Sequence, residues 1–184
     1  SLVLKMPAAQ NSDIRLNLGP LQQVGYVVAD VEGSAKTWVS NCGIGPWRVK
    51  SNVSFDSCKY HGNSTEITFN IATAYSGDIE IKLIAQESGP SSVYSDFLDL
   101  YGPGIQHTCF YPSDYKKALK VFLDNGASVI FEGVIGGAAF SYLKDSLGQM
   151  IELVDLPTEV IDLRSGRASE ALNWDGSDPI RKVK

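Results

Sequence analysis

The chain has 184 residues, of which 43% are hydrophobic and 20% charged, enough to bury a sizeable core in one domain or two small ones. Its 16 lysines and arginines are scattered and its formal net charge is −5, which argues against a nucleic-acid surface. No apolar run approaches the roughly 18 residues of a membrane span, residues 1–5 do not resemble a signal peptide, and three cysteines suggest no disulfide framework. We therefore expect a cytoplasmic protein.

A polar leader over residues 1–20 precedes the first regular pattern, a strand followed by a helix. The β-branched and aromatic content of residues 22–28 is typical of a strand, and Asp30 is placed to cap a helix over 31–39. Gly43 supplies the left-handed residue that ends such a helix. Strand patterns and then a short helix follow, over residues 47–51, 55–61, 66–74 and 78–86 and over residues 91–101.

The same order of elements then begins again. A strand over 104–111 leads to Asp114, which is placed to cap a helix over 115–123. Three more strands are expected over residues 128–133, 138–143 and 150–156. Beyond Pro157 the pattern predicts a short helix over 158–163 and then a loose tail.

One offset relates the two halves. Asp30 and Asp114 are 84 residues apart (114 − 30), and the same offset relates other strand, core and helix-end positions, namely Gln23 and His107, Trp38 and Phe122, and Asn41 and Asn125. An internal repeat of this kind predicts two copies of one supersecondary unit. We predict an α+β fold of two βαβββ modules, over residues 21–103 and 104–157, with a C-terminal extension over 158–184. Two such modules form a half-open barrel around a small-molecule pocket.

Four short motifs carry a family resemblance. They are Gln-Val-Gly-Tyr-Val-Val-Ala-Asp at 23–30, Gly-Ile-Gly-Pro-Trp at 43–47, Gly-Ile-Gln-His at 104–107 and Gly-Gln-Met-Ile-Glu-Leu at 148–153. In this order they resemble the vicinal-oxygen-chelate superfamily of glyoxalases, bleomycin-resistance proteins and dioxygenases, with methylmalonyl-CoA epimerase-like and glyoxalase-like members most similar. The resemblance covers most of the chain and also implies a homodimer.

Metal-using members of that superfamily take four ligands from positions that correspond here to Gln23, Lys82, His107 and Glu152. His107 and Glu152 suit a divalent metal, and Gln23 is a weaker ligand. Lys82 does not suit one, because a protonated ammonium has no lone pair and repels a dication. We therefore expect no firmly bound cofactor, and His107, Glu152 and Lys82 become the candidate catalytic residues. If the strand register differs, Glu80 replaces Lys82 as a ligand and a metal is expected again.

The remaining substrate-binding candidates are polar or aromatic residues on predicted strands: Gln23, Trp47, Tyr60, His61 and Tyr142. The resemblance implies an enzyme of the isomerase, epimerase or lyase type, acting on a small oxygenated substrate with a carbonyl or carboxylate group. The alternative is a protein that binds and sequesters a small molecule without chemistry, as bleomycin-resistance proteins do. Neither a membrane nor a nucleic acid is expected as a partner.

Overall fold

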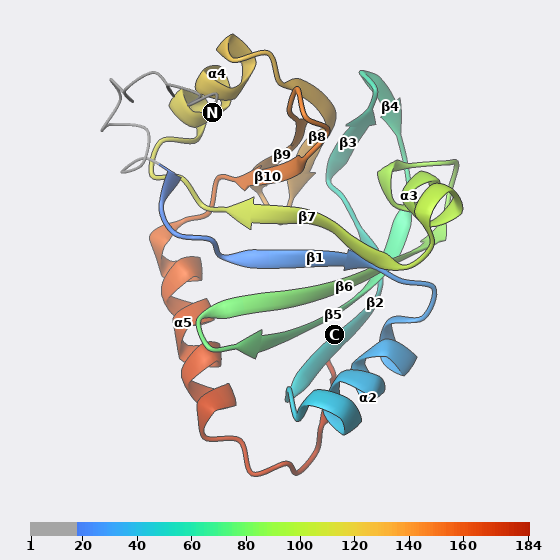
Figure 1. Cartoon of the computed structure of the whole chain (residues 1–184), viewed down its shortest axis with the longest axis vertical. Helices are drawn as coiled ribbons and strands as arrows, with labels where there is room; N and C mark the ends of the chain where they lie inside the picture. Colours follow the sequence, from blue (N-terminus) through green and yellow to red (C-terminus); the bar gives the residue numbers. More distant parts are fainter. Residues whose placement is uncertain (1–17) are drawn as a thin grey trace, which may run out of the picture.

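The computed structural model describes residues 18–184, so the expected leader lies almost wholly outside the described residues. Within them, eleven strands form one curved sheet in the order β11-β2-β5-β6-β1-β7-β10-β9-β8-β3-β4 (Figure 1). The sheet does not close, and the few helices pack around it. The predicted α+β class with a half-open barrel is therefore confirmed.

Two halves of the sheet repeat one strand order. The first half contains β1 (Gln23–Val27), α2 (Val31–Cys42), β2 (Trp47–Ser54), β5 (Thr68–Ser76) and β6 (Ile79–Ser88). After α3 (Val93–Tyr101), the second half contains β7 (Gly104–Phe110), α4 (Tyr115–Asp124), β8 (Ser128–Ile135), β9 (Ala138–Lys144) and β10 (Met150–Val154). The orders β2-β5-β6-β1 and β8-β9-β10-β7 correspond, and the antiparallel pair of β1 and β7 joins them at the centre.

The helix caps follow the predicted repeat. The Asp30 carboxylate accepts hydrogen bonds from the backbone N–H groups of Glu32 and Gly33, both at 3.1 Å. Asp114 accepts one from the backbone of Lys117 at 3.0 Å, in the equivalent position. Gly43 ends α2 with a φ of 65°, a left-handed conformation that favours glycine. Both aspartates thus satisfy N–H groups that a helix start leaves unpaired.

Two segments depart from the expected pattern. Residues 55–61 were expected as a strand of the first module, but the hairpin of β3 (Ser57–Tyr60) and β4 (Asn63–Thr65) crosses over and pairs with β8 of the second half. The C-terminal helix α5 (Thr158–Leu172) continues well beyond the expected end at 163. The tail that was expected to be loose then forms β11 (Ile180–Lys182), which pairs in parallel with β2. Neither long-range pairing is visible in the local pattern.

The two faces of the sheet serve different purposes. On the outer face, α2 packs Val31 and Ala35 against Trp47 and Leu83, and α4 packs against β10. The inner face carries aromatic side chains from both halves, which pack against each other at centroid distances of about 5–6 Å: Phe55, Phe69, Tyr94, Phe131, Phe140 and Tyr142. Of the helices in residues 18–184, none has the length and apolar character needed to cross a membrane.

Candidate functional site

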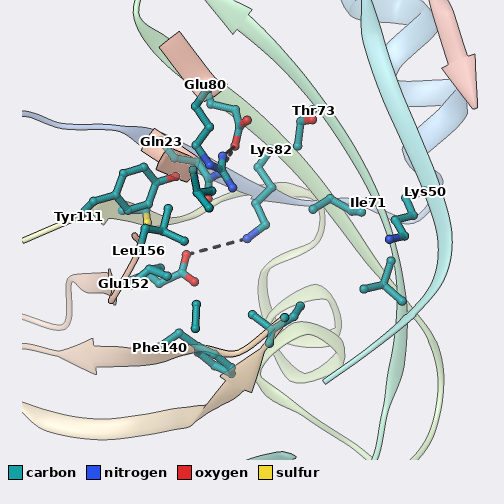
Figure 2. Close-up of a pocket in the computed structure, with 18 of the residues that line it drawn as sticks. Gln23, Lys50, Ile71, Thr73, Glu80, Lys82, Tyr111, Phe140, Glu152 and Leu156 are labelled. Carbon is teal, nitrogen blue, oxygen red and sulfur yellow. Dashed lines mark hydrogen bonds and ion pairs between the residues drawn. The ribbon is translucent and has the colours of Figure 1, made fainter. Parts of the chain in front are cut away.

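A cavity of about 850 Å³ lies on the concave face of the sheet, with walls from both halves and one side formed by α5. Its lining combines the apolar side chains of that face with a polar group that gathers at the centre (Figure 2). The volume is in the range of small-molecule sites. The polar residues in the wall are Gln23, Thr73, Glu80, Lys82, Glu152, Asp155, Arg48, Lys50, Arg164, Arg167 and Lys184.

Strand register brings the central polar residues together. Gln23 on β1 lies opposite Glu80 on β6 and opposite Cys109 on β7, and Cys109 in turn lies opposite Glu152 on β10. Two residues further along β1, Gly25 lies between Lys82 and His107. Paired residues point to the same face of a sheet, so two adjacent rows of side chains face the cavity.

His107 occupies the space above Gly25. A Cβ atom added at Gly25 would overlap the imidazole ring, so the ring of His107 on β7 can lie over β1 only because residue 25 is a glycine. The ring is fully buried and its centroid lies 4.7 Å from that of Tyr142. His107 therefore lies buried behind the cavity lining, with its Nε2 edge directed at Glu152.

We expect Gly25→Ala to lower the free energy of unfolding by about 1–3 kcal/mol, because the added methyl group displaces a fully packed ring. Urea denaturation at pH 7 measures this loss, with Gly104→Ala, where a Cβ meets no atom within 4 Å, as the matched control. The same variant is expected to change the ring environment of His107 in NMR spectra. An unchanged stability and an unshifted His107 signal would contradict this placement of the ring.

The partners of His107 define its protonation state. The Gln106 amide donates to the backbone carbonyl of Val93 at 2.7 Å, which directs its Oε1 towards His107 Nδ1 at 3.0 Å. Nδ1 therefore carries the proton, and Nε2 presents a lone pair. Burial lowers the pKa of His107, so the ring is neutral at neutral pH.

Glu152 is the carboxylate next to this lone pair. Its Oε2 lies 3.2 Å from His107 Nε2, but in the described part of the chain neither atom has an aligned hydrogen-bond partner. The Lys82 ammonium, which also lines the cavity, lies 3.9 Å from the same Oε2 (Figure 2). Burial alone would raise the pKa of Glu152, but the Lys82 charge, together with His107 and the Cys109 thiol, outweighs burial and the pKa falls to about 2. Glu152 is thus ionised, and Lys82 is its counter-ion.

A second hydrogen-bond network in the cavity wall centres on Glu80. The Gln23 amide donates to Glu80 Oε1, and the Arg164 guanidinium of α5 donates to the same oxygen from Nη1 at 2.7 Å. Arg164 also lies over the ring of Tyr111, with its Cζ 5.4 Å from the ring centroid. Glu80 is only 2% exposed, so its charge depends on this arginine.

The four positions that would hold a metal in the resembled superfamily divide into two unlike pairs. His107 and Glu152 place a lone pair and a carboxylate oxygen at the spacing of two ligands of one cation. Gln23 is engaged with Glu80, and Lys82 brings a positive charge beside Glu152. Among residues 18–184, no group of three or more His, Cys, Asp and Glu side chains is arranged to bind a metal. The residues present do not fit a four-ligand metal centre.

Gln23, Lys82, Glu152 and Tyr142 line the cavity, and His107 lies directly behind Glu152. Glu80 and Lys82 both line it, because residues two apart on a strand share a face. Lys82 therefore does not face away from the site, and Glu80, the alternative ligand, is engaged by Gln23 and Arg164.

Three substrate-binding candidates do not line the cavity. Trp47 is fully buried on the outer face beneath α2, where its indole N–H donates to the Ile44 carbonyl at 2.8 Å. Tyr60 donates to Asp96 at 2.7 Å, away from the site. His61 is exposed in the turn between β3 and β4. Strand alternation explains the error at Trp47, because its neighbour Arg48 takes the inner face.

Sequence reasoning missed the basic residues that α5 and β2 contribute to the cavity. Val160, Arg164 and Arg167 follow each other at four and three residues, so they share one face of α5. This spacing was available in the sequence, but most of the helix was taken as a loose tail. Arg48 and Lys50 alternate with buried Trp47 and Val49, which marks them as residues of the other face.

Comparison with solved structures finds the same fold in proteins of low sequence identity. Methylmalonyl-CoA epimerase from Mycobacterium tuberculosis superposes with a TM-score of 0.54 at 21% identity, covering 85% of this chain and 97% of its own. A hypothetical protein from Bacillus halodurans C-125 gives 0.55 at 17% identity, covering 75% and 94%. A selenomethionine form of methylmalonyl-CoA epimerase gives 0.51 at 16%, covering 76% and 97%.

Comparison at the sequence level gives two results. No curated protein matches this sequence. The model of the Glyoxalase/Bleomycin resistance protein/Dioxygenase superfamily matches residues 22–142, which include both copies of the strand-helix repeat and three of the four central positions. The match covers well over half of the chain. This protein therefore belongs to the glyoxalase, bleomycin-resistance protein and dioxygenase superfamily.

Proposed function

We propose that this protein is an enzyme of the isomerase, epimerase or lyase type that moves a proton beside a carbonyl or carboxylate group of a small substrate, without a resident metal. One observation carries the proposal. An ionised carboxylate, Glu152, and an ammonium, Lys82, stand 3.9 Å apart in the wall of a cavity of small-molecule size. Such a pair offers a base and a positive charge for the oxygen that becomes negative.

The roles follow from charge. Glu152 takes the proton from the carbon next to the carbonyl, and the C–H electron pair moves into the enolate, whose oxygen the Lys82 ammonium stabilises. Delivery of a proton from water to the opposite face of that carbon gives epimerisation, and return of the proton from Glu152 to a neighbouring carbon gives isomerisation. Loss of a leaving group from the next carbon gives elimination. His107 lies behind Glu152 as a buried imidazole, and the Gln106 amide determines its orientation.

The low pKa of Glu152 in the free protein makes it a weak base until substrate binds. Lys82 is the main opposing influence to burial on this carboxylate. A substrate oxygen that binds the ammonium takes over part of that charge and displaces water, and both changes raise the pKa of Glu152. Binding of the correct substrate thus activates the base.

Exchange of carbon-bound hydrogen for deuterium tests this proposal directly. We expect the protein to accelerate exchange in a panel of small 2-oxo acids and 2-substituted malonates dissolved in D₂O, followed by proton NMR. Glu152→Gln and Lys82→Met are each expected to lower the rate about 10²–10⁴-fold, because each removes one of the two groups that the transition state needs. Lys116→Met, an exposed lysine on α4, is the matched control and is expected to leave the rate unchanged.

Repeating the exchange assay after treatment with EDTA tests whether a metal takes part, and the exchange rate is expected to be unchanged. Exchange that is equally fast in Glu152→Gln would contradict the proposal. Saturable binding of these compounds without any exchange would instead identify a sequestering protein of the bleomycin-resistance kind.

A further inference from the structure

The cavity is basic in a protein that is acidic overall. Six lysines and arginines line it against three acids, whereas the whole chain carries a net charge of −5. The lining acids are Glu80, Glu152 and Asp155, and the lining bases are Arg48, Lys50, Lys82, Arg164, Arg167 and Lys184. A concentration of one sign of charge in a concave site raises the local concentration of ligands of the opposite sign.

Three of these six bases already have carboxylate partners. Lys82 faces Glu152, Arg164 binds Glu80, and Arg48 binds Glu170 of α5 at 2.7 Å. Outside the cavity lining, Arg181 of β11 binds the other oxygen of Glu170, also at 2.7 Å.

The other three bases are Lys50, Arg167 and Lys184. Within residues 18–184, none of them forms an ion pair with an acidic side chain or a side-chain hydrogen bond. Asp155 is the one lining acid without a basic partner in that part of the chain. The unpaired lining charge is therefore predominantly positive.

These three bases come from the elements at the β2 side of the cavity. Lys50 lies two residues beyond Arg48 on β2, on the same face. The backbone N–H of Val183 donates to the Val49 carbonyl at 2.9 Å, which brings the end of the chain alongside Lys50. Arg167 of α5 lines, together with Arg48, a small recess next to the main cavity.

This basic group lies apart from the Lys82–Glu152 pair. Figure 2 shows Lys50 on the far side of the cavity from Glu152, with Ile71 between Lys50 and Lys82. Register agrees, since Lys50 on β2 pairs with Ile71 on β5, while Lys82 on β6 pairs with Thr73. Ile71 is apolar, and Val53, Phe69 and Phe140 add further apolar surface to the same cavity.

We propose that Lys50, Arg167 and Lys184 form a second anion-binding subsite, and that the substrate is a small molecule with two anionic groups joined by a short apolar part. This inference rests on the proposed function for the reacting end, where Lys82 receives the first oxygen. The second group, a carboxylate or a phosphate, binds the basic cluster. Arg167 supplies planar paired donors for it, and the two lysines supply point charges.

The subsite is tested by binding alone, independently of turnover. Isothermal titration calorimetry at low ionic strength compares succinate and glutarate with butyrate and valerate, and phosphonopropionate serves as the phosphate-like arm. The wild-type protein is expected to bind at least one dianion about 10-fold or more tightly than its matched monocarboxylate, which corresponds to about 1.4 kcal/mol. Whichever class of dianion binds more tightly, the dicarboxylates or phosphonopropionate, identifies the second group as a carboxylate or a phosphate.

Substitutions assign the preference to residues. Arg167→Gln and Lys50→Gln are each expected to remove most of the preference for dianions while leaving the affinity for monocarboxylates within about 2-fold. Lys59→Gln, an exposed lysine on β3 outside the cavity, is the control and keeps the preference. Equal binding of dianions and monoanions by the wild type, or a preference that survives in the Lys50→Gln, Arg167→Gln double variant, would overturn the subsite.

The two proposals fail separately. If deuterium exchange is absent but the dianion preference depends on Arg167, the subsite stands and the proposed reaction falls. If exchange is present and depends on Glu152 while the preference is absent, the reaction stands and the subsite falls.

Discussion

Replacing Arg164 with methionine is expected to lower the free energy of unfolding by about 3 kcal/mol, the lower end of the loss when one partner of a buried ion pair is removed. Glu80 is 2% exposed and shares its Oε1 between Gln23 and Arg164, so the variant leaves a buried carboxylate with only an amide donor. The Arg164 side chain itself is 27% exposed, and this places the loss at the low end. Urea denaturation at pH 7 measures the change.

Two further variants separate charge from packing. Glu80→Gln introduced into the Arg164→Met protein is expected to recover much of the lost stability, because no uncompensated charge then remains. Arg48→Met is the matched control, since its partner Glu170 is 42% exposed and such pairs contribute about 1 kcal/mol or less. An Arg164→Met protein as stable as Arg48→Met would show that Glu80 does not depend on the arginine of α5.

Lys82→Glu is expected to convert the site into one that retains a divalent metal at one ion per chain. His107 Nε2 and Glu152 Oε2 already lie 3.2 Å apart without aligned hydrogen bonds, and the new carboxylate adds a third ligand beside them. The lysine that it replaces opposes a metal strongly. A unit charge about 4 Å from a dication repels it by about 8 kcal/mol at an effective dielectric constant near 20.

Elemental analysis for zinc, nickel, cobalt and manganese, on protein purified without chelator, provides the measurement. Lys50→Glu makes the same change of charge within the cavity but on β2, on the far side from Glu152, and is expected to gain no metal. A stoichiometric metal in the unmodified protein would refute the argument, as would a Lys82→Glu protein that remains free of metal.

Local sequence patterns predicted much of the fold because each copy of the repeat contains its own signals. The capping aspartates Asp30 and Asp114 and the alternation along β6 arise from interactions within a few residues, and such interactions are visible in one dimension. Lys82 and Glu152 were also expected in one site, because both correspond to ligand positions of the resembled superfamily. The structure places their charged atoms 3.9 Å apart.

The parts that were missed depend on contacts between distant segments. Arg164 reaches Glu80 only because α5 packs beside β5, and the sequence of residues 158–172 does not indicate that Glu80 is its partner. The pairing of the β3–β4 hairpin with β8 likewise depends on tertiary contacts and not on the local sequence. Trp47 was misplaced for another reason. An aromatic residue on a strand suits either face, and here the outer face, beneath α2, buried it completely.

The pairing of β11 with β2 has a consequence for the order in which the chain folds. Residues 180–182 bind the strand at 47–49, so the outer edge of β2 stays open until the segment about 130 residues further along the chain has been synthesised. Contacts of such long sequence separation form slowly, and an open strand edge invites pairing with other chains in the meantime. The basic group of Lys50, Arg167 and Lys184 is therefore complete only after β11 has paired with β2, so that acquisition of anion affinity reports the joining of these two distant segments.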